Sequence, residues 1–443
     1  MNNEQLIINN SQVLEGYKQT EVGVIPENWE VIPLKVISRV NQGLQIAIEE
    51  RLNHPTEKSK RYITIQAINS GEFTEYIESY SPSVCCTEND VLMTRTGNTG
   101  IIVTGISGVF HNNFFKVDFD RDKLNKDFFV YYLRTETTQK IILEKAGTST
   151  IPDLNHNDFY SIEIVLPPIE EQQAIATTLS DIDALIAKLD KLIAKKRHLK
   201  TATMQQLLTG KKRLPGFGES INNEQLIINN SQVPEGYKQT GVGVIPEDWD
   251  VRILGSLASI QRGASPRPID NPVWFDRNSL VGWVRISDVT RSGIYLQETK
   301  QKLSPLGIQH SRSVSKGSLI MSICATVGRP IITEIDVCIH DGFVVLDNLK
   351  TEQLFMYYIL KWLEPSWSKQ GQTGSQMNLN TELINSTAVY LPSTLEQRAI
   401  ATVLSDIDTE ITALETRRTK TQAIKQGMMQ ELLTGRTRLI NNE

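Results

Sequence analysis

Two stretches of this chain are each written twice, and in both cases the copies lie about half a chain apart. Residues 166–214 return without a gap at 391–439, and roughly half of the aligned positions are identical. Residues 2–31 return at 222–251, with differences only at Leu14/Pro234, Glu21/Gly241, Asn28/Asp248 and Glu30/Asp250. Such a period is too long for a solenoid repeat. The sequence therefore predicts two copies of one plan, a globular domain followed by a helix, with pseudo-two-fold symmetry.

Length and composition set broad limits on the fold and the compartment. A chain of 443 residues with 40% hydrophobic content suggests two to four packed domains. Its longest apolar runs, such as 101–103 and 342–346, are far too short to span a bilayer, and the first residues do not resemble a secretory signal. The four cysteines, Cys85, Cys86, Cys324 and Cys338, show no zinc-binding spacing. We expect a protein of the reducing cytoplasm without a metal site.

The charge of the chain neither requires nor excludes a nucleic-acid partner. Its net charge is −5, and no segment is strongly basic apart from the run at 191–198. A protein that binds DNA non-specifically would carry a clear excess of Lys and Arg. If this chain contacts DNA, it must therefore use a local face, or a partner must supply much of the phosphate contact.

The repeat at 166–214 and 391–439, called the second repeat because it follows that at 2–31, reads as a long helix in both copies. Pro167, Pro168 and the acidic residues after them suit a first helical turn, and Ser393 with Glu396 forms a capping-box pattern. Gly210 and Gly435 are natural residues to follow the last turn. About 40 helical residues at 1.5 Å each predict a rod of roughly 60 Å.

Apolar residues in each long helix recur at alternating steps of four and three, which is the pattern of a coiled-coil seam. They are Ile175, Leu179, Ile182, Ile186, Leu189 and Ile193 in the first copy, and Ile400, Leu404, Ile407, Ile411 and Leu414 in the second. So narrow a stripe is not stable alone. The alternative is a coiled coil that merely dimerises the protein. Because a partner helix is present in the same chain, we predict that the two copies pack antiparallel as an internal spacer.

The segments between the repeats diverge but keep a common order. Each begins with Gly-Val-Ile-Pro-Glu-x-Trp and continues into β-rich stretches. These stretches are 61–67, 91–95, 100–106 and 113–119 in the first half, and 282–286, 318–324 and 342–346 in the second. Each half then has a helix with an aromatic pair, Tyr131-Tyr132 or Tyr357-Tyr358, which we expect in the core. A Gly/Ser/Thr loop follows at 147–155 and at 371–380. Two alike folds with different surfaces suit two recognition modules.

Some loops in these modules combine the residue types that read DNA bases. Arg pairs with guanine and Asn or Gln with adenine in the major groove, and Gly lets the backbone approach closely. The candidates are Arg95, Thr96, Asn98 and Thr99 in the first module and Arg262, Ser265, Arg267 and Arg285 in the second. The competing interpretation of each is an ordinary surface turn. The six histidines form no constellation, and we interpret all of them as structural or solvated.

Motifs for catalysis are missing or incomplete. The sequence lacks the GxxxxGK[ST] loop of a nucleotide site. Asp270-Asn271-Pro272-Val273 is similar to the (D/N)PP(Y/F) loop of amino-methyltransferases, but it has one proline and no glycine-rich cofactor loop before it. The sequence therefore shows no motif for a nucleotide site and no complete motif for a methyltransferase.

The repeated motifs resemble those of the specificity subunits of type I restriction-modification systems. They are Gly-Val-Ile-Pro-Glu-x-Trp at 23–29 and 243–249, Leu-Pro-(x)3-Glu-Gln-x-Ala-Ile-Ala-Thr-x-Leu-Ser-Asp-Ile-Asp at 166–183 and 391–408, and Met-Gln-x-Leu-Leu-Thr-Gly at 204–210 and 429–435. The match spans nearly the whole chain. The basic run at 191–198 and the polar residues before each first motif depart from it.

This resemblance implies an α+β fold and a non-catalytic role in DNA recognition. Two target-recognition domains would each read one half of a bipartite, asymmetric DNA site. The helices would set the gap between the half-sites and dock two modification subunits, through seam positions such as those named above. Those subunits would carry S-adenosylmethionine and methylate adenine N6, and restriction subunits would join for cleavage. This chain itself would bind no cofactor.

The implied domains follow the repeats. They are a polar segment at 1–21, recognition domains at 22–165 and 242–390, helical spacers at 166–214 and 391–443, and a linker at 215–241. Two other functions stay open at this point, namely a coiled-coil adaptor whose modules bind protein and a stand-alone enzyme with an unrecognised site.

Overall fold

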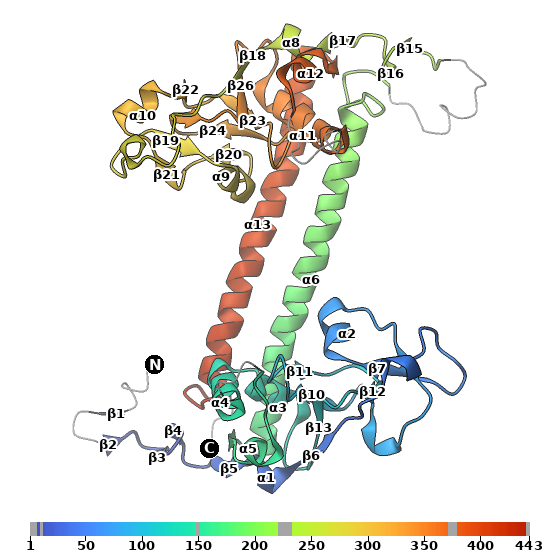
Figure 1. Ribbon diagram of the computed structural model, residues 1–443, viewed down its shortest axis with the longest axis vertical. Helices are drawn as coiled ribbons and strands as arrows, with labels where there is room; N and C mark the ends of the chain where they lie inside the picture. Colours follow the sequence, from blue (N-terminus) through green and yellow to red (C-terminus); the bar gives the residue numbers. More distant parts are fainter. Residues whose placement is uncertain (1–6, 9–11, 148–150, 220–232, 371–378, 440–443) are drawn as a thin grey trace. The chain divides into compact units, whose positions relative to one another are not determined.

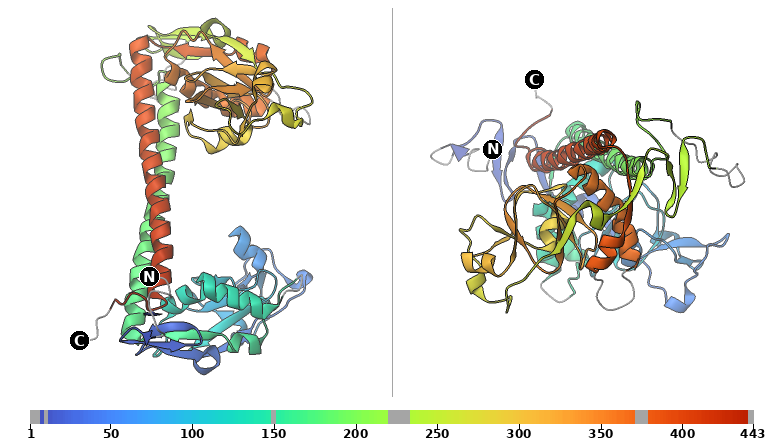
Figure 2. Two further views of the ribbon diagram at one scale, coloured as in Figure 1. Left: turned by 90° about the vertical axis from the view of Figure 1, so that its left-hand side faces the viewer. Right: turned by 90° about the horizontal axis from the view of Figure 1, so that it is seen from above.

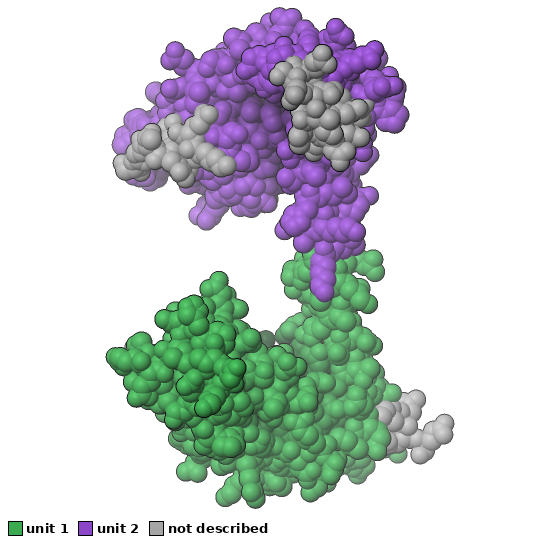
Figure 3. Space-filling view, turned by 90° about the vertical axis from the view of Figure 1, so that its right-hand side faces the viewer, with its two compact units in different colours: residues 1–190, 416–443 green, residues 191–415 purple. Residues whose placement is uncertain are grey.

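A computed structural model describes residues 7–8, 12–147, 151–219, 233–370 and 379–439. The chain divides into two compact units, shown in two colours in Figure 3. Unit 1 joins Met1–Asp190 to Thr416–Glu443, and unit 2 is Lys191–Glu415. Each unit therefore contains one module, the first half of the helix that follows it, and the second half of the other long helix.

The described strands of unit 1 form two four-stranded sheets and three two-stranded ones. The four-stranded sheets have the orders β11-β10-β13-β6 and β8-β7-β12-β9, and β12 and β7 run parallel. The strands are β1 (Ile7–Ile8), β2 (Gln12–Val13), β3 (Tyr17–Thr20), β4 (Gly23–Pro26), β5 (Glu30–Pro33), β6 (Ser38–Gln42), β7 (Lys60–Ile63), β8 (Tyr76–Ile77), β9 (Cys85–Cys86), β10 (Val91–Thr94), β11 (Ile102–Val103), β12 (Gly108–Phe110), β13 (Phe114–Phe119) and β14 (Glu163–Leu166).

Short helices join and flank the strands of unit 1. They are α1 (Leu34–Ile37), η2 (Ile48–Glu50), α2 (Ile65–Ser70), η3 (Pro82–Val84), α3 (Lys126–Leu133), α4 (Glu136–Ala146) and α5 (His156–Tyr160). Apolar residues of α3 pack with those of β10 and β13 in one core. The sequence predicts that the pair Tyr131-Tyr132 lies in the core. This is confirmed for Tyr131 of α3, which is 7% exposed.

Unit 2 repeats this plan with a five-stranded sheet, β18-β26-β23-β24-β20, and a four-stranded sheet, β21-β19-β25-β22, in which β19 and β25 run parallel. Its strands are β15 (Tyr237–Thr240), β16 (Gly243–Pro246), β17 (Asp250–Ile253), β18 (Ser259–Arg262), β19 (Gly282–Val284), β20 (Tyr295–Leu296), β21 (Gln301–Lys302), β22 (Arg312–Val314), β23 (Leu319–Ser322), β24 (Pro330–Thr333), β25 (Val337–Ile339), β26 (Phe343–Asp347) and β27 (Ala388–Leu391). Its shorter helices are α8 (Leu254–Leu257), η4 (Pro272–Trp274), α9 (Ile286–Arg291), α10 (Pro305–Gln309), α11 (Gln353–Gln370) and α12 (Thr381–Ser386).

Two of the stretches predicted to be β-rich turn into helices halfway. The stretch 61–67 is strand only to Ile63, and Thr64 then caps α2 by accepting a hydrogen bond from the backbone N–H of Ala67. The stretch 282–286 likewise leaves β19 at Val284, and the backbone N–H of Arg285 donates to Asp288 at 3.0 Å. In both places local capping hydrogen bonds outweigh the β-propensity of the residues.

The second repeat forms the long helices α6 (Ile169–Leu207) and α13 (Thr394–Leu432), which lie side by side within each unit in Figures 1 and 2. In unit 1, Asp183 pairs with Lys425 and Asp190 with Arg418. In unit 2, the residues of α6 that pair with α13 are Lys196, Arg197 and Lys200, whose partners are Glu410, Glu415 and Asp408. The partner falls from Lys425 to Arg418 between Asp183 and Asp190, and from Glu410 to Asp408 between Lys196 and Lys200, so the predicted antiparallel packing is confirmed. The mixture of sheets and helices in both units confirms the predicted α+β fold.

The predicted seam residues pack inside the units. Ile175 and Leu179 join the core of unit 1, and Ile400 and Leu404 join that of unit 2. The other seam residues are all buried or half-buried; these are Ile182, Ile186, Leu189, Ile193, Ile407, Ile411 and Leu414. Within the described residues, no helix combines the length and apolar character needed to cross a membrane.

The loop predicted at 371–380 falls largely outside the described residues, as do residues 148–150 of the loop predicted at 147–155, most of 2–12 and all of 222–232.

Candidate nucleic-acid interface

Polar side chains gather in unit 1 where β6 leaves the sheet β11-β10-β13-β6. The chain passes there against the end of β12, since the backbone N–H groups of Gly43 and Leu44 donate to the carbonyls of Phe114 and Phe110, at 3.2 and 3.0 Å. A Cβ atom on Gly43 would overlap the carbonyl oxygens of Phe110 and His111. Glycine is needed because the two backbones touch.

Unit 2 has the same backbone arrangement where β18 ends. Gly263 and Ala264 donate to the carbonyls of Phe343 and Ile339, at 2.9 and 3.1 Å. A Cβ atom on Gly263 would overlap the carbonyl oxygens of Ile339 and His340. Gly43 and Gly263 are therefore equivalent positions in the two modules.

A histidine supports the neighbouring turn in both units. Nδ1 of His111 accepts a hydrogen bond from the backbone N–H of Asn113 at 3.1 Å, and Nδ1 of His340 accepts one from Gly342 at 2.9 Å. Burial lowers the pKa of both imidazoles, and that of His340 falls to about 4, with Arg285 adding to the effect. Both rings are therefore neutral near pH 7 and act as acceptors that hold the turn.

We call the side chains on this backbone the strand-exit cluster. In unit 1 it comprises the amides of Gln42, Gln45 and Asn112. Nε2 of Gln42 donates to the backbone carbonyl of Asn112 at 3.3 Å, and Nδ2 of Asn112 donates to Oε1 of Gln45 at 2.9 Å. Both glutamines are exposed. The cluster of unit 1 is neutral and can both donate and accept hydrogen bonds.

In unit 2 the strand-exit cluster comprises Arg262, Ser265, Arg267 and Asp341. Nε of Arg262 donates to the backbone carbonyl of Asp341 at 2.6 Å. The hydroxyl of Ser265 donates to Oδ1 of Asp341 at 2.6 Å, and Nη2 of Arg267 lies 3.3 Å from Oδ2. The Ser265 hydrogen bond, aided by Arg267, holds the pKa of the Asp341 carboxyl below its usual value. The two clusters therefore share positions and bonds but differ in charge.

Most side chains of the first loop predicted to read bases bond to other residues of their own module. Arg95 pairs with Asp153 at 2.9 Å and its side chain is 15% exposed, and the hydroxyl of Thr96 also donates to Asp153. Thr99 is buried and donates to the carbonyl of Pro152 at 2.8 Å. Of the four residues predicted there, only Asn98 has an exposed side chain.

The residues predicted in the second module divide between two places. Arg262, Ser265 and Arg267 come together in the strand-exit cluster. Arg285 stands apart at the start of α9, where its Nε donates to Oε1 of Gln301 at 2.9 Å and its guanidinium lies over the ring of Trp283. Whether any of the eight predicted residues contacts DNA stays a prediction.

The sequence analysis missed Gln42, Gln45 and Asn112. A signal for two of them was present, because the repeat of 2–31 at 222–251 can be extended in register. Eleven residues beyond its end, Gln42-Gly43 aligns with Arg262-Gly263, and three residues after Gln42, Gln45 aligns with Ser265. The flanking residues are so different that the shared glycine alone did not suggest an equivalent position.

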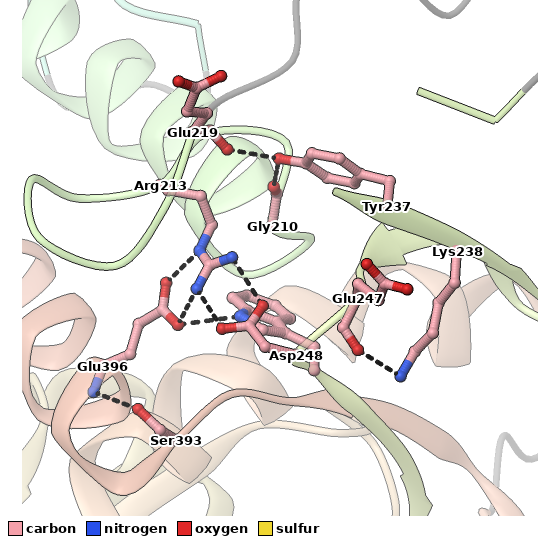
Figure 4. A network of polar contacts seen from close by, with 10 residues as sticks. Gly210, Arg213, Glu219, Tyr237, Lys238, Glu247, Asp248, Ser393 and Glu396 are labelled. Atoms are coloured by element: carbon pink, nitrogen blue, oxygen red, sulfur yellow. Dashed lines mark hydrogen bonds and ion pairs between the residues drawn. The ribbon is translucent and has the colours of Figure 1, made fainter. Parts of the chain in front are cut away.

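A second polar network in unit 2 joins the segment after α6 to the start of α13 and to Asp248, as Figure 4 shows. Arg213, which follows α6, donates to Glu396 in the first turn of α13 at 2.6 and 2.8 Å and to Asp248 at 2.9 Å. Trp249 donates from its indole N–H to the same Glu396 at 2.9 Å. The predicted capping box at the start of α13 is therefore half correct. Ser393 accepts from the backbone N–H of Glu396, but the carboxylate is engaged by Arg213 and Trp249.

Unit 1 has the corresponding network, built from the other copies of the repeats. Arg438, which follows α13, donates to Glu171 at 2.5 and 2.7 Å, and the indole of Trp29 donates to Glu171 at 2.9 Å. We call these networks the latches. Next to each latch, a tyrosine hydroxyl donates a hydrogen bond to a backbone carbonyl just after a long helix. Tyr17 donates to the carbonyl of Gly435, and Tyr237 donates to that of Gly210.

Gly210 and Gly435 have positive φ values of 69° and 72°, which confirms their predicted place after the last helical turn. The described part of the near-identical first repeat therefore has a structural role in both units, since Tyr17 and Trp29, and likewise Tyr237 and Trp249, contact the ends of the long helices.

Among the described residues, no group of three or more His, Cys, Asp or Glu side chains is placed to hold a metal ion.

Comparison with known proteins agrees with this architecture. A family model described as the type I restriction modification DNA specificity domain matches residues 26–195 and 246–426. The MjaVIII specificity subunit of a type I restriction enzyme from Methanocaldococcus jannaschii is 25% identical over 96% of this chain and 97% of its own length. The EcoBI specificity subunit of Escherichia coli is 21% identical over 85% of this chain and 78% of its own.

A solved structure supports the same fold. The S subunit of a type I restriction-modification system from M. genitalium has a TM-score of 0.54 at 15% identity, over 91% of this chain and 96% of that one. Most of the repeat at 166–214 and 391–439 lies within the two regions that the family model matches, whereas most of the repeat at 2–31 and 222–251 precedes them. This chain belongs to the family of type I restriction-modification DNA specificity domains.

Proposed function

We propose that this chain is the specificity subunit of a type I restriction-modification complex and that each module reads one half of a bipartite DNA site. The observation that carries this proposal is the strand-exit cluster. The two modules share its backbone almost bond for bond, but one presents amides and the other presents arginines around a carboxylate. Two modules with a common frame and different reading groups suit two unlike half-sites.

The partners follow from membership of the family. DNA is the ligand, and modification and restriction subunits are the protein partners of a specificity subunit. We further propose that two modification subunits dock on the long helices, which would set the gap between half-sites. S-adenosylmethionine would be bound by those subunits, which would methylate adenine N6. In this role the chain is a recognition subunit and not an enzyme.

The test is to map N6-methyladenine across the genome of a heterologous host that expresses the cognate modification subunit, with and without this chain. We expect a split motif with two unlike halves, only when the chain is present. A soluble complex that gives no chain-dependent methylation would contradict the proposal and favour a protein-binding adaptor.

A further inference from the structure

The latches and the strand-exit clusters differ in how the two units fill equivalent positions. At the latches, the same residue types recur in both units, Trp29 with Glu171 and Trp249 with Glu396. At the strand-exit cluster the backbone recurs, but the side chain before the glycine changes from Gln42 to Arg262. A structural contact needs the same chemistry in both modules. A contact that distinguishes two half-sites needs different chemistry on the same frame.

Arg262 is held in a way that leaves its guanidinium fork available. Its side chain is exposed, and Nε is anchored on the backbone carbonyl of Asp341. Neither Nη1 nor Nη2 has a hydrogen-bond partner among the described residues. Arg312 buttresses the same turn from β22, because its Nε donates to the backbone carbonyl of Arg262 at 2.5 Å. Two parallel N–H donors on an anchored stem match the O6 and N7 acceptors of guanine.

Gln42 occupies the same position in unit 1 with a different pattern. One N–H of its amide is anchored on the backbone carbonyl of Asn112, the counterpart of Asp341. Oε1 and the second N–H have no partner within the described part of the chain, so the amide keeps one acceptor and one donor. This pair matches the N6 donor and N7 acceptor of adenine.

Deepening the function proposed above, on which this inference rests, we propose that Gln42 and Arg262 are the equivalent base-reading residues of the two modules. Gln42 reads an adenine in one half-site, and Arg262 reads a guanine in the other. Asn112 and Asp341 act as positioning residues, since their backbone carbonyls hold the reading side chains by the stem.

The experiment exchanges the two side chains one at a time, with Arg262→Gln and Gln42→Arg in the full chain, in complex with its modification subunits. The methylated motif of each variant is mapped and compared with that of the unchanged chain. Arg262→Gln should relax or change one guanine position, with a loss of discrimination of about 5- to 150-fold there. The other half-site should be unaltered. Gln42→Arg should alter one adenine position in that other half only.

Two further variants separate base reading from general effects. Arg262→Lys keeps the positive charge but loses the fork, so it should lose selectivity at the same guanine. Arg252→Gln removes an exposed arginine of β17, whose side chain is 56% exposed, and should leave the motif unchanged.

The inference would be overturned if Arg262→Gln lowered methylation equally at all sites without changing the motif, because a phosphate contact behaves in that way. It would also be overturned if both exchanges altered the same half-site, or if both left the motif intact. These results differ from a failure of the proposed function, in which the unchanged chain itself would direct no methylation.

Discussion

Arg213 holds Glu396 through two hydrogen bonds, from Nε at 2.6 Å and from Nη2 at 2.8 Å, in an ion pair that water hardly reaches. The two side chains are 4% and 1% exposed. They connect the segment after α6 to the first turn of α13, so one pair joins two parts of the chain 183 residues apart. The Arg438–Glu171 pair repeats this connection in unit 1.

Replacing Glu396 with Gln should strongly destabilise unit 2, because it leaves the buried charge of Arg213 without its main partner. Breaking a buried pair typically costs about 3–5 kcal/mol. Urea unfolding of the full chain, followed by hydrogen exchange on unit 2, measures the loss. Arg252→Ala removes the exposed pair with Asp250 and should change stability by less than about 1 kcal/mol. Equal effects of the two variants would contradict the importance of burial.

The latches differ at one position of the first repeat, where unit 1 has Asn28 and unit 2 has Asp248. Asp248 is 62% exposed and pairs with Arg213, which lowers the pKa of its carboxyl. Asp248→Asn should therefore weaken unit 2 by no more than about 1 kcal/mol near pH 7. The lowered pKa means that this contribution is present above the carboxyl's unfolded pKa of about 3.9 and fades as the pH falls below it. The free energies of unfolding of the unchanged chain and of Asp248→Asn, plotted against pH, should converge in acid. A difference that stays constant with pH would refute this.

His340 should make unit 2 sensitive to mild acid. Its pKa is about 4 in the folded protein against 6.5 unperturbed, because it is buried beside Arg285, although Asp341 partly offsets the effect. Between these values only the unfolded chain takes up the proton, so stability falls as the pH falls from 6.5 to 4 and then levels off. The total is on the order of 3 kcal/mol, since each pH unit corresponds to about 1.4 kcal/mol. Unfolding of His340→Gln from pH 7 to 4 should have a flatter dependence than the unchanged chain.

Gly263→Ala should disturb the strand-exit cluster of unit 2, because the added Cβ would meet the backbone carbonyls of Ile339 and His340. Overpacking of this kind typically costs about 1–3 kcal/mol. Gly293→Ala is the matched control, since no heavy atom lies within 4 Å of its Cβ position. Thermal unfolding of both variants would decide, and a lower melting temperature is expected for the first alone.

Gly427→Ala should stabilise the chain. Gly427 lies inside α13 with nothing within 4 Å of its Cβ position, and the corresponding residue of α6 is Ala202. Replacing an exposed helical glycine by alanine gains about 0.5–1 kcal/mol because fewer unfolded conformations are lost. A higher urea midpoint with an unchanged slope is the expected result, and a decrease would show that the glycine has another task.

Repetition explains why much of the fold could be predicted. The a/d pattern from Ile175 to Ile193 and its copy depend on short-range periodicity, which the sequence displays directly. The glycines after the two long helices could be predicted for the same reason. The strand-to-helix changes at Thr64 and Arg285 could not, because a hydrogen bond from one capping group decides them against the residues' propensity.

The sequence by itself determined that there are two similar modules, two long antiparallel helices and one family to which the chain belongs. These properties are carried by repeats and motifs that are contiguous along the chain. Only the tertiary structure decided that Arg95 is a half-buried partner of Asp153, whereas the guanidinium fork of Arg262, beside Asp341, has no partner within the described part of the chain. The two arginines look alike as letters in a loop. What separates them is the position of a carboxylate or a carbonyl 58 and 79 residues away, which the packing of the sheets brings close.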